Sequence, residues 1–366
     1  MTGWFGARVW PGRAPDGQGG IVAGSGPRRR AGAAGGVPRA MAEPRALWAA
    51  WARVAAGSGM PGADGLSVAD FARELGPRLD RLADQLAEGG YAPQPLRLVT
   101  ITRGGRRRAL GLPTVRDRVA QRAFLDVCHE QLDADAVEVS FAYRRGRSWL
   151  DALAAAERHR DAGRRVVLRT DIADYFARIR HDLLLAALAP AVPADGVELV
   201  RGWITAPVLT ERGIVARREG VPEGAPVSPA LANVYLRSFD AAVHRRPGFL
   251  VRYADDIAVF CADTEQAVQS AHVAGGALAA LDLAMNQEKT YVSSFDRGFS
   301  FLGWVFFQDG GWEAEPSAGW THPMSVGRGR AAAAPDPRAY TGPPPRGRSP
   351  AAPRAAHAPS ASWRSP

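Results

Sequence analysis

The chain has 366 residues, 46% of them hydrophobic, and a formal net charge of +9 at pH 7 that comes almost entirely from arginine. This composition excludes a wholly disordered protein, because it supplies enough apolar surface for a core of one or two subdomains. The charge indicates a polyanionic partner, although a GC-rich genome that encodes many arginines would give the same surplus.

The two cysteines, Cys128 and Cys261, are too few for a disulfide framework or a four-cysteine zinc site. No run of residues has the length and hydrophobicity of a membrane span, and the N-terminus does not resemble a secretory signal. We therefore expect a cytoplasmic protein without a membrane segment.

Residues 1–40 are rich in glycine, arginine and proline and show no hydrophobic periodicity. We interpret them as disordered, or as mistranslated sequence upstream of a start at Met41. After this segment the pattern changes, and apolar residues at helical spacing predict one helix around 47–54 and a second from about 68 to the glycines at 89–90.

Residues 91–113 are predicted to be extended, because Pro93 and Pro95 exclude a long helix. The second half of this segment carries arginines on both sides of two glycines at 104–105. Such a pattern favours a hairpin that closes over phosphates, although an ordinary solvated basic hairpin has the same pattern. Helices are expected over 116–132 and 150–162, with a basic loop at 141–148 between them.

A strand is predicted over 165–170, ending at Asp171, and a helix near His181. An acidic residue at the end of a buried strand lies at a sheet edge, where ligands gather. The glycines and prolines at 220–229 predict a rigid turn, after which Ser228 would cap a helix with Pro229 at its first position.

Residues 249–261, F-L-V-R-Y-A-D-D-I-A-V-F-C, are the stretch around which the rest is organised. Two strand-like runs flank a polar centre, which predicts a β-hairpin with Asp255 and Asp256 at its tip. Adjacent carboxylates repel each other, and a divalent cation is the simplest way to keep both ionised. Together with Asp171 they could hold two Mg²⁺ ions for phosphoryl transfer, with Asp171 and Asp255 bridging the ions. Alternatively, Asp171 is only a strand-end cap, and Y-x-D-D also arises by chance.

A helix over 264–281, a segment with Asn286 and Lys289, and a strand-like run over 299–307 complete the predicted fold. Beyond Met324 the chain has no leucine or isoleucine. Residues 308–366 are therefore expected to form a low-complexity tail that cannot bury enough apolar surface to fold.

Several motifs follow one another in a recognisable order. They are R-A-L-G-L-P-T-V-R-D-R-V-A-Q at 108–121, F-A-Y-R-R-G-R-S at 141–148, D-I-A-D-Y-F from Asp171, G-V-P-E-G-A-P-V-S-P at 220–229, Y-A-D-D, N-Q-E-K-T and F-S-F-L-G. This succession resembles the bacterial reverse transcriptases, most closely the group II intron-like lineage that includes CRISPR-associated and retron-type enzymes. So many motifs in the family's order argue against coincidence.

The resemblance implies an α+β right-hand polymerase with disordered tails. Its palm would be an antiparallel sheet with packed helices (about 166–189 and 226–307), and its fingers would be built from about 60–165 and 190–225. The family's thumb would follow Phe307, so the thumb is expected to be degenerate or absent. The implied activity is RNA-directed DNA synthesis: deoxynucleotides are added to the 3′-hydroxyl of a DNA or RNA primer on an RNA template, with two Mg²⁺ ions. CRISPR adaptation proteins are further candidate partners.

Carried over by position, the resemblance assigns Asp171, Asp255 and Asp256 to the metal ions, with the Ile172 carbonyl as an extra oxygen ligand. Phe176 matches the bulky gate beneath the sugar, which would clash with a ribose 2′-hydroxyl. Its alternative role, as a core aromatic after a strand, is compatible with this.

The resemblance also places residues on the substrates. Arg103 and Arg108 would grip the triphosphate, and Tyr253 would contact the primer end. Lys289 would lie near the leaving pyrophosphate as a general acid, although a lone lysine is more often an exposed surface residue. Glu223 departs from the family, which has glutamine there. Its carboxylate only accepts hydrogen bonds, which is unfavourable near a triphosphate unless it turns away or pairs with arginine.

Two other functions stay open on the sequence. An RNA-templated RNA polymerase shares the carboxylate geometry, and Phe176 argues against it because such an enzyme must accept a 2′-hydroxyl. The chain could also be a truncated, inactive nucleic-acid-binding remnant of a polymerase.

Overall fold

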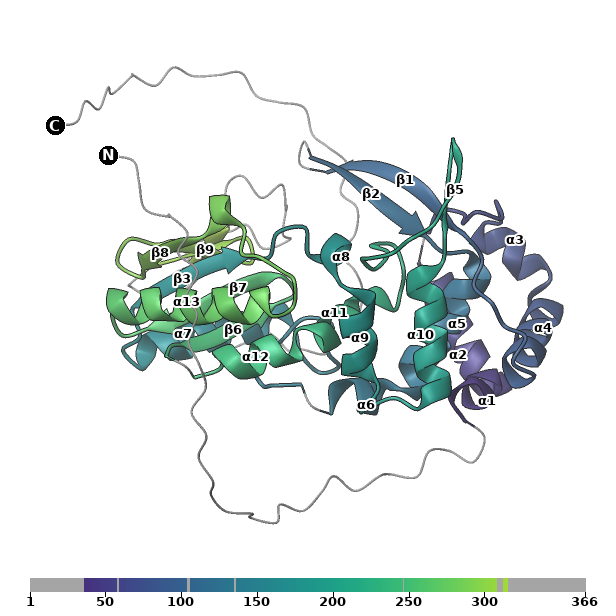
Figure 1. The fold of residues 1–366 in the computed structure, drawn as a ribbon, viewed down its shortest axis with the longest axis horizontal. Coiled ribbons are helices and arrows are strands. Elements are labelled where there is room, and N and C mark those ends of the chain that lie inside the picture. Colours follow the sequence, from purple (N-terminus) through teal and green to yellow (C-terminus); the bar gives the residue numbers. More distant parts are fainter. Residues whose placement is uncertain are drawn as a thin grey trace, which may run out of the picture.

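Residues 36–57, 59–103, 106–134, 136–245, 247–307 and 312–314 are described in a computed structural model of the protein. They form a largely helical N-terminal lobe and a second lobe built around a β-sheet, which lie side by side in Figure 1. The two lobes are joined by the short helices α8 (Tyr175–Arg178) and α9 (His181–Leu188) and by helix α11 (Ser228–Tyr235).

The N-terminal lobe packs its helices around a shared apolar core. The helices are α1 (Gly36–Ala42), α2 (Pro44–Ala55), α3 (Val68–Arg73), α4 (Leu75–Ala87), α5 (Val115–Val127), α6 (His129–Asp133) and α10 (Ala194–Thr205). Helix α1 corrects the predicted boundary at residue 41, since it begins five residues earlier. Val37 and Met41 lie four residues apart and are both buried, so this turn has an apolar face that stabilises it. Residues 1–35 lie outside the described residues.

Side chains cap several of these helices as their sequences suggest. Ser67 and Ser148 each form a capping box with an aspartate three residues later, at the starts of α3 and of α7 (Trp149–Asp161), a helix of the second lobe. The predicted cap at Ser228 was wrong by one residue, because α11 starts at Ser228 itself and Val227 precedes it. The Leu231 amide donates to the Val227 carbonyl at 3.1 Å, which is the first bond of the helix, so Val227 holds the N-cap position.

The predicted basic hairpin is present. β1 (Leu96–Arg103) pairs with β2 (Arg106–Leu112) in antiparallel register, from Arg97 opposite Leu112 to Arg103 opposite Arg106. β1 also pairs with β4 (Val208–Thr210), which forms a second hairpin with β5 (Gly213–Val215). The resulting sheet has the order β2-β1-β4-β5 and extends from the N-terminal lobe in Figure 1.

The second lobe contains the central sheet, which has the order β6-β7-β3-β8 and only antiparallel pairs. Its strands are β3 (Val166–Asp171), β6 (Phe249–Tyr253), β7 (Asp256–Cys261) and β8 (Tyr291–Ser294). Alternate residues enter different cores: Leu168 and Leu250 belong to the large core, and Val167 and Val251 to a smaller, phenylalanine-rich one. This confirms the predicted α+β fold with an antiparallel sheet and packed helices.

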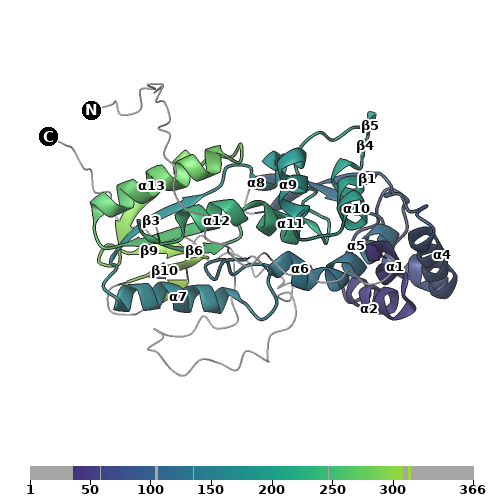
Figure 2. The same ribbon diagram turned by 60° about the horizontal axis from the view of Figure 1, so that its bottom comes forward.

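Helices cover both faces of the central sheet. α13 (Thr264–Ala279) lies on one face with α12 (Arg237–Val243), and α7 (Trp149–Asp161) lies on the other, as Figure 2 shows. The face with α7 also carries a small antiparallel sheet of β9 (Phe299–Phe301), β10 (Trp304–Phe306) and β11 (Trp312–Ala314). No helix in the described part of the chain is both long enough and apolar enough for a bilayer span.

Strand β11 corrects the predicted start of the C-terminal tail at residue 308. Trp312 pairs with Phe306 and Ala314 with Trp304. Pairing with β10 satisfies the backbone of this short segment, which the composition of the tail did not reveal. The rest of the predicted tail, and the expectation of a degenerate thumb, lie outside the described residues. The division into fingers and palm stays a prediction.

Candidate active site

Three acidic residues lie at one end of the central sheet, at the tip of the β6–β7 hairpin. Tyr253 pairs with Asp256, so Ala254 and Asp255 form a two-residue turn. Asp256 also lies directly opposite Asp171, the last residue of β3. The sequence predicted this juxtaposition, because the strand pattern located the ends of both strands. Two neighbouring strands therefore bring the three carboxyl residues to the same edge.

The Asp255 side chain is half-buried, and no cation pairs with it among the described residues. Burial raises the pKa of its carboxyl, and the negative charges of Asp171 and Asp256 raise it further, while Lys289 lowers it. The carboxylates are therefore close enough to repel one another. Such a group gains stability when a cation binds beside it.

Only one of the two carboxylate oxygens of Asp171 has a partner. Its Oδ2 forms an ion pair with Lys289 Nζ, whereas its Oδ1 is buried and has no hydrogen-bond partner in the described structure. Buried carboxylate oxygens without partners are rare, and an absent ion is one explanation for them. Lys289 thus lies beside the carboxylates and contacts one of them, and its predicted place near the leaving pyrophosphate stays a prediction.

Backbone contacts explain why Lys289 lies there. The segment that contains η1 (Gln287–Lys289) is joined to the end of β3 by Asn286 N to Asp171 O at 2.8 Å and by Ala173 N to Ala284 O at 3.0 Å. These two bonds flank Ile172, and neither uses its carbonyl oxygen. The role of that oxygen as a metal ligand stays a prediction.

Asp256 is engaged on both oxygens. Its Oδ1 lies 2.6 Å from Arg169 Nη2, and its Oδ2 accepts from the Leu302 amide at 3.2 Å. Arg169 is itself held by the Ser300 carbonyl at 2.5 Å and lies over the Phe301 ring, 4.9 Å from its centroid. The β9–β10 turn is therefore fixed against the hairpin that carries Asp255.

The donor set fits Mg²⁺ in kind, because carboxylate oxygens are its preferred protein ligands and one of them is buried without a partner. The side chains, however, are not already arranged around a position for a metal ion. Within the described ranges, no group of three or more His, Cys, Asp or Glu side chains is arranged to hold a metal ion. Lys289 and Arg169 occupy oxygens of Asp171 and Asp256, so two of the three carboxylates would have to turn toward the ion.

The predicted sugar gate, Phe176, follows β3 on helix α8. Its ring is half-buried and packs edge-on against Tyr175, with centroids 5.5 Å apart. Its carbonyl accepts from the Val221 amide at 2.8 Å, and Gly220 N donates to the Ile179 carbonyl at 2.7 Å. The turn at 220–229 is therefore bonded to the helix that carries Phe176.

Gly220 makes this close approach possible, since its φ is +76° and an added Cβ would lie 2.7 Å from the Ala177 carbonyl oxygen. Glu223, the departure from the family pattern, has an exposed side chain. It thus points to solvent, the arrangement that the sequence analysis required of it.

The structure gives little support to the two arginines that were predicted to bind the triphosphate. Arg108 is exposed on β2, opposite Ile101. Arg103 ends β1, and its side chain lies outside what the structure describes. Among the described residues no ion pair links Arg108 to the three carboxylates, so both triphosphate assignments stay predictions.

Two tyrosines approach the hairpin tip. Burial raises the pKa of Tyr253, which was predicted to contact the primer. Burial also raises the pKa of Tyr143, and the charges of Asp255 and Tyr253 add to this. Sequence reasoning interpreted 141–148 only as a basic loop and missed Tyr143. Its side chain remains half exposed beside the carboxylates.

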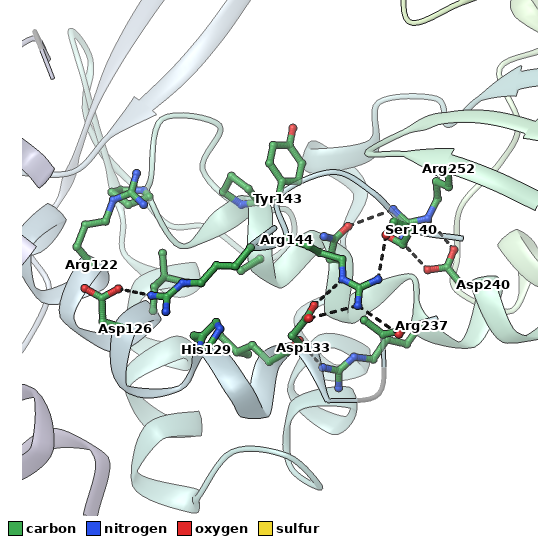
Figure 3. A pocket seen from close by; sticks show the side chains of 18 of the residues that line it. Arg122, Asp126, His129, Asp133, Ser140, Tyr143, Arg144, Arg237, Asp240 and Arg252 are labelled. Atoms are coloured by element: carbon green, nitrogen blue, oxygen red, sulfur yellow. Dashed lines mark hydrogen bonds and ion pairs between the residues drawn. The ribbon is translucent and has the colours of Figure 1, made fainter. Parts of the chain in front are cut away.

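Arg252 is 1% exposed and joins several elements below the turn. Its guanidinium binds both oxygens of Asp240 on α12, the Asn233 side chain at 3.2 Å and the Ser140 hydroxyl at 2.8 Å. Figure 3 shows this group beside the loop that carries Tyr143. Sequence reasoning missed the network, although an arginine inside an apolar strand was the available signal, because a buried charge requires a partner.

A cavity of about 280 Å³ adjoins this network and separates α5 and α6 from α11. Much of its positive charge is neutralised locally: Arg144 Nε lies 2.6 Å from Asp133 Oδ1, and Arg145 Nη2 lies 2.9 Å from Asp126 Oδ1 (Figure 3). The cavity reaches Tyr143, so it opens toward the hairpin tip.

The chain matches a family model described as "Reverse transcriptase (RNA-dependent DNA polymerase)" over residues 102–306, which is more than half of its length. It is 29% identical over 288 residues to protein YkfC of Escherichia coli K12, covering 68% of this chain and 76% of YkfC. It is 28% identical over 169 residues to the group II intron-encoded protein LtrA of Lactococcus lactis, covering 45% of this chain and 28% of LtrA.

Among solved structures, a Cas6-RT-Cas1–Cas2 complex contains a similar chain, with a TM-score of 0.42 and 24% identity over 68% of this chain and 26% of that one. The match to LtrA agrees with the group II intron-like character expected from the motifs. The chain belongs to the reverse transcriptase family, the RNA-directed DNA polymerases.

Proposed function

We propose that this protein extends a primer 3′-hydroxyl with deoxynucleotides at the hairpin tip, with Asp171, Asp255 and Asp256 holding two Mg²⁺ ions. One observation carries the proposal: two neighbouring strands place three carboxyl groups at one edge, and one of their buried oxygens, Asp171 Oδ1, has no partner in the described structure. The raised pKa of Asp255 supports it, because burial and the negative charges of Asp171 and Asp256 raise this pKa and a bound cation would offset both.

When bound, the two ions would supply an acidified primer hydroxyl and neutralisation of charge on the triphosphate. The side chains of this protein have separate tasks. Lys289 would leave Asp171 and donate a proton to the departing pyrophosphate. Arg169 would release Asp256 Oδ1 to the ion, while its contact with the Ser300 carbonyl keeps the β9–β10 turn in place. Phe176 would exclude a ribose 2′-hydroxyl, and Tyr143 would join Tyr253 at the primer end.

The proposed substrates are an RNA template, a DNA or RNA primer and deoxynucleoside triphosphates. The net charge of +9 supports an extended nucleic-acid contact, whose affinity should fall as salt rises because bound phosphates release counterions. Arg103 and Arg108 are the proposed triphosphate contacts. Association with CRISPR adaptation proteins stays a prediction from the motif resemblance.

The test is primer extension by Asp255→Ala on a DNA primer annealed to an RNA template. The variant should extend nothing measurable while it binds the RNA with nearly unchanged affinity. Asp296→Ala is the matched control, because Asp296 is exposed and pairs only loosely with Arg165, at 3.4 Å; it should extend as the wild type does. Extension that persists in Asp255→Ala would defeat the metal assignment.

One observation favours the inactive nucleic-acid-binding alternative. Lys289 and Arg169 already satisfy oxygens of two proposed ligands, as in a site that no longer binds an ion. The same assay decides, because an inactive binder would retain RNA affinity in wild-type protein and extend nothing at any Mg²⁺ concentration.

A further inference from the structure

A second cavity, of about 360 Å³, lies at the end of the central sheet opposite to the carboxylates. We call it the β6 cavity. It lies where β6 begins, since Phe249 pairs with Phe260 there, whereas Tyr253 pairs with Asp256 at the hairpin tip. Helices α7 and α12 both contact β6, and Figures 1 and 2 show the three elements together. Its charged and titratable lining residues are Glu138, Arg158, His159, Arg164, His244 and Arg245.

The lining is strongly biased toward positive charge, with three arginines and two histidines against one glutamate. In the part of the chain that the structure describes, none of the three arginines forms an ion pair with a carboxylate. Arg164 instead lies over the Phe249 ring, 3.6 Å from its centroid, with Nη1 3.3 Å from His159 Nδ1. His244 Nδ1 is buried and has no hydrogen-bond partner among the described residues.

The pKa values of the two imidazoles are both lowered, as expected beside several positive charges. Burial, followed by the charges of Arg164, Arg158 and His244, lowers the pKa of His159 to about 4. Burial and the charge of Arg245 lower the pKa of His244, against a weaker opposing effect of Glu138. The β6 cavity thus has a surplus of positive charge that its own residues leave uncompensated.

The aromatic rings of the cavity are not free for stacking. Arg164 covers Phe249, and the Arg147 guanidinium lies 5.3 Å from the centroid of Phe141. The His159 ring stacks on Phe260, with centroids 5.1 Å apart. These contacts compete with the stacking of a nucleobase, so recognition rests on charge and hydrogen bonding.

We propose that the β6 cavity binds a phosphate group through Arg158, Arg164 and Arg245, with the two histidines as additional donors. Guanidinium groups bind phosphate oxygens in a forked geometry, and imidazole N–H groups can complete the contact. The phosphate could come from a free anion such as pyrophosphate or from the backbone of a nucleic-acid strand. This site is separate from the polymerase site and does not depend on the proposed catalytic roles.

The test measures pyrophosphate binding by calorimetry in EDTA, so that no metal can recruit the anion to the carboxylates. Arg158 and Arg245 are exposed, so the full-length double variant Arg158→Gln/Arg245→Gln should fold. We expect it to bind pyrophosphate at least about tenfold more weakly than the wild type, since two charge-assisted hydrogen bonds are lost. The matched control is Arg73→Gln/Arg201→Gln, which removes two exposed arginines elsewhere and should bind within about twofold of the wild type.

A second arm adds an unlabelled 20-nucleotide single strand to the wild-type complex. Displacement of pyrophosphate supports the site as a contact for a strand backbone, and retention of pyrophosphate supports it as a site for a free anion. Equal pyrophosphate affinity of the two double variants, or no binding by the wild type, would overturn the proposal. Primer extension is not part of this readout, so the proposed polymerase function can fail or hold independently.

Discussion

Arg252 donates two hydrogen bonds to Asp240, from Nε to Oδ1 at 2.6 Å and from Nη2 to Oδ2 at 2.5 Å. Both residues are at most 2% exposed. Arg252 Nη1 also donates to the Ala254 carbonyl at 2.9 Å, and Ala254 has a φ of 59°, a left-handed conformation that costs a non-glycine residue about 1–3 kcal/mol. The pair therefore fixes the turn that presents Asp255.

The first prediction separates the stabilising role of this pair from its positioning role. Asp240→Leu leaves a buried arginine without its partner and should lower the free energy of unfolding by about 3–5 kcal/mol. The double variant Arg252→Met/Asp240→Leu should recover most of this stability, because it replaces both charges by apolar groups. It should still extend primers poorly, since the Ala254 carbonyl has lost its donor. Urea unfolding and primer extension measure the two effects.

A solvent-exposed ion pair provides the control for the Arg252 and Asp240 variants. Arg201 and Glu198 lie 3.1 Å apart on α10 with half or more of each side chain exposed, so Arg201→Met/Glu198→Leu should change stability by less than about 1 kcal/mol. If Arg252→Met/Asp240→Leu recovers primer extension as fully as it recovers unfolding free energy, the buried pair does not position the turn.

A second prediction concerns the turn that is bonded to the Phe176 helix. Gly220→Ala introduces a Cβ that would lie 2.7 Å from the Ala177 carbonyl oxygen at a φ of +76°. Gly146→Ala is a matched control, because Gly146 has a φ of +71° with nothing within 4 Å of the added Cβ. Gly146→Ala should cost about 1–2 kcal/mol of unfolding free energy, and Gly220→Ala about 1–3 kcal/mol more. Equal losses in urea unfolding would show that the turn can move away from α8.

The sequence was sufficient to predict the strands that carry Asp171, Asp255 and Asp256, because a period of two and a two-residue turn are local properties. It could not predict the Arg169–Asp256 pair. Arg169 is 9% exposed, and its guanidinium contacts Ser300 and Phe301 of β9, which lies far along the chain. The partner of Arg252 could not be predicted either, because Asp240 lies on a different element and no local sequence pattern links the two residues.

Short elements were missed for a related reason. Helix α1 is seven residues long, and β11 has three, so neither contains enough periodicity to be recognised. Each is stabilised by a surface that the rest of the chain provides: α1 buries Val37 and Met41, and β11 completes a sheet with β10. Local patterns predict elements that are long and amphipathic, whereas these depend on tertiary packing.

The third prediction tests the sugar gate. Phe176→Ala should allow ribonucleotides to be incorporated at a rate closer to that of deoxynucleotides, because the side chain that would contact the 2′-hydroxyl is removed. Phe176→Tyr retains the ring and should keep the wild-type discrimination. The measurement is the ratio of extension rates with the two nucleotide sets on one primer and template. If Phe176→Ala discriminates as well as Phe176→Tyr does, the residue is only a packing partner of Tyr175.

The fourth prediction concerns stability against pH. The folded protein holds the pKa of His159 at about 4, below its ordinary value of 6.5, chiefly by burial. Between these two values the unfolded chain binds a proton that the folded protein does not, so the free energy of unfolding should fall as the pH decreases from about 6.5 to about 4. His181 and His244, whose pKa values are also lowered, should add to the same slope.

Urea midpoints at several pH values in phosphate-free buffer should therefore fall less steeply in His159→Gln than in the wild type. The comparison uses the slope because the substitution also removes the stacking of the imidazole on Phe260 and lowers stability at every pH. His272→Gln, on the exposed side of α13, should keep the wild-type slope. Parallel curves for His159→Gln and the wild type would contradict the prediction, because they would show that this imidazole takes up its proton in the folded protein as readily as in the unfolded chain.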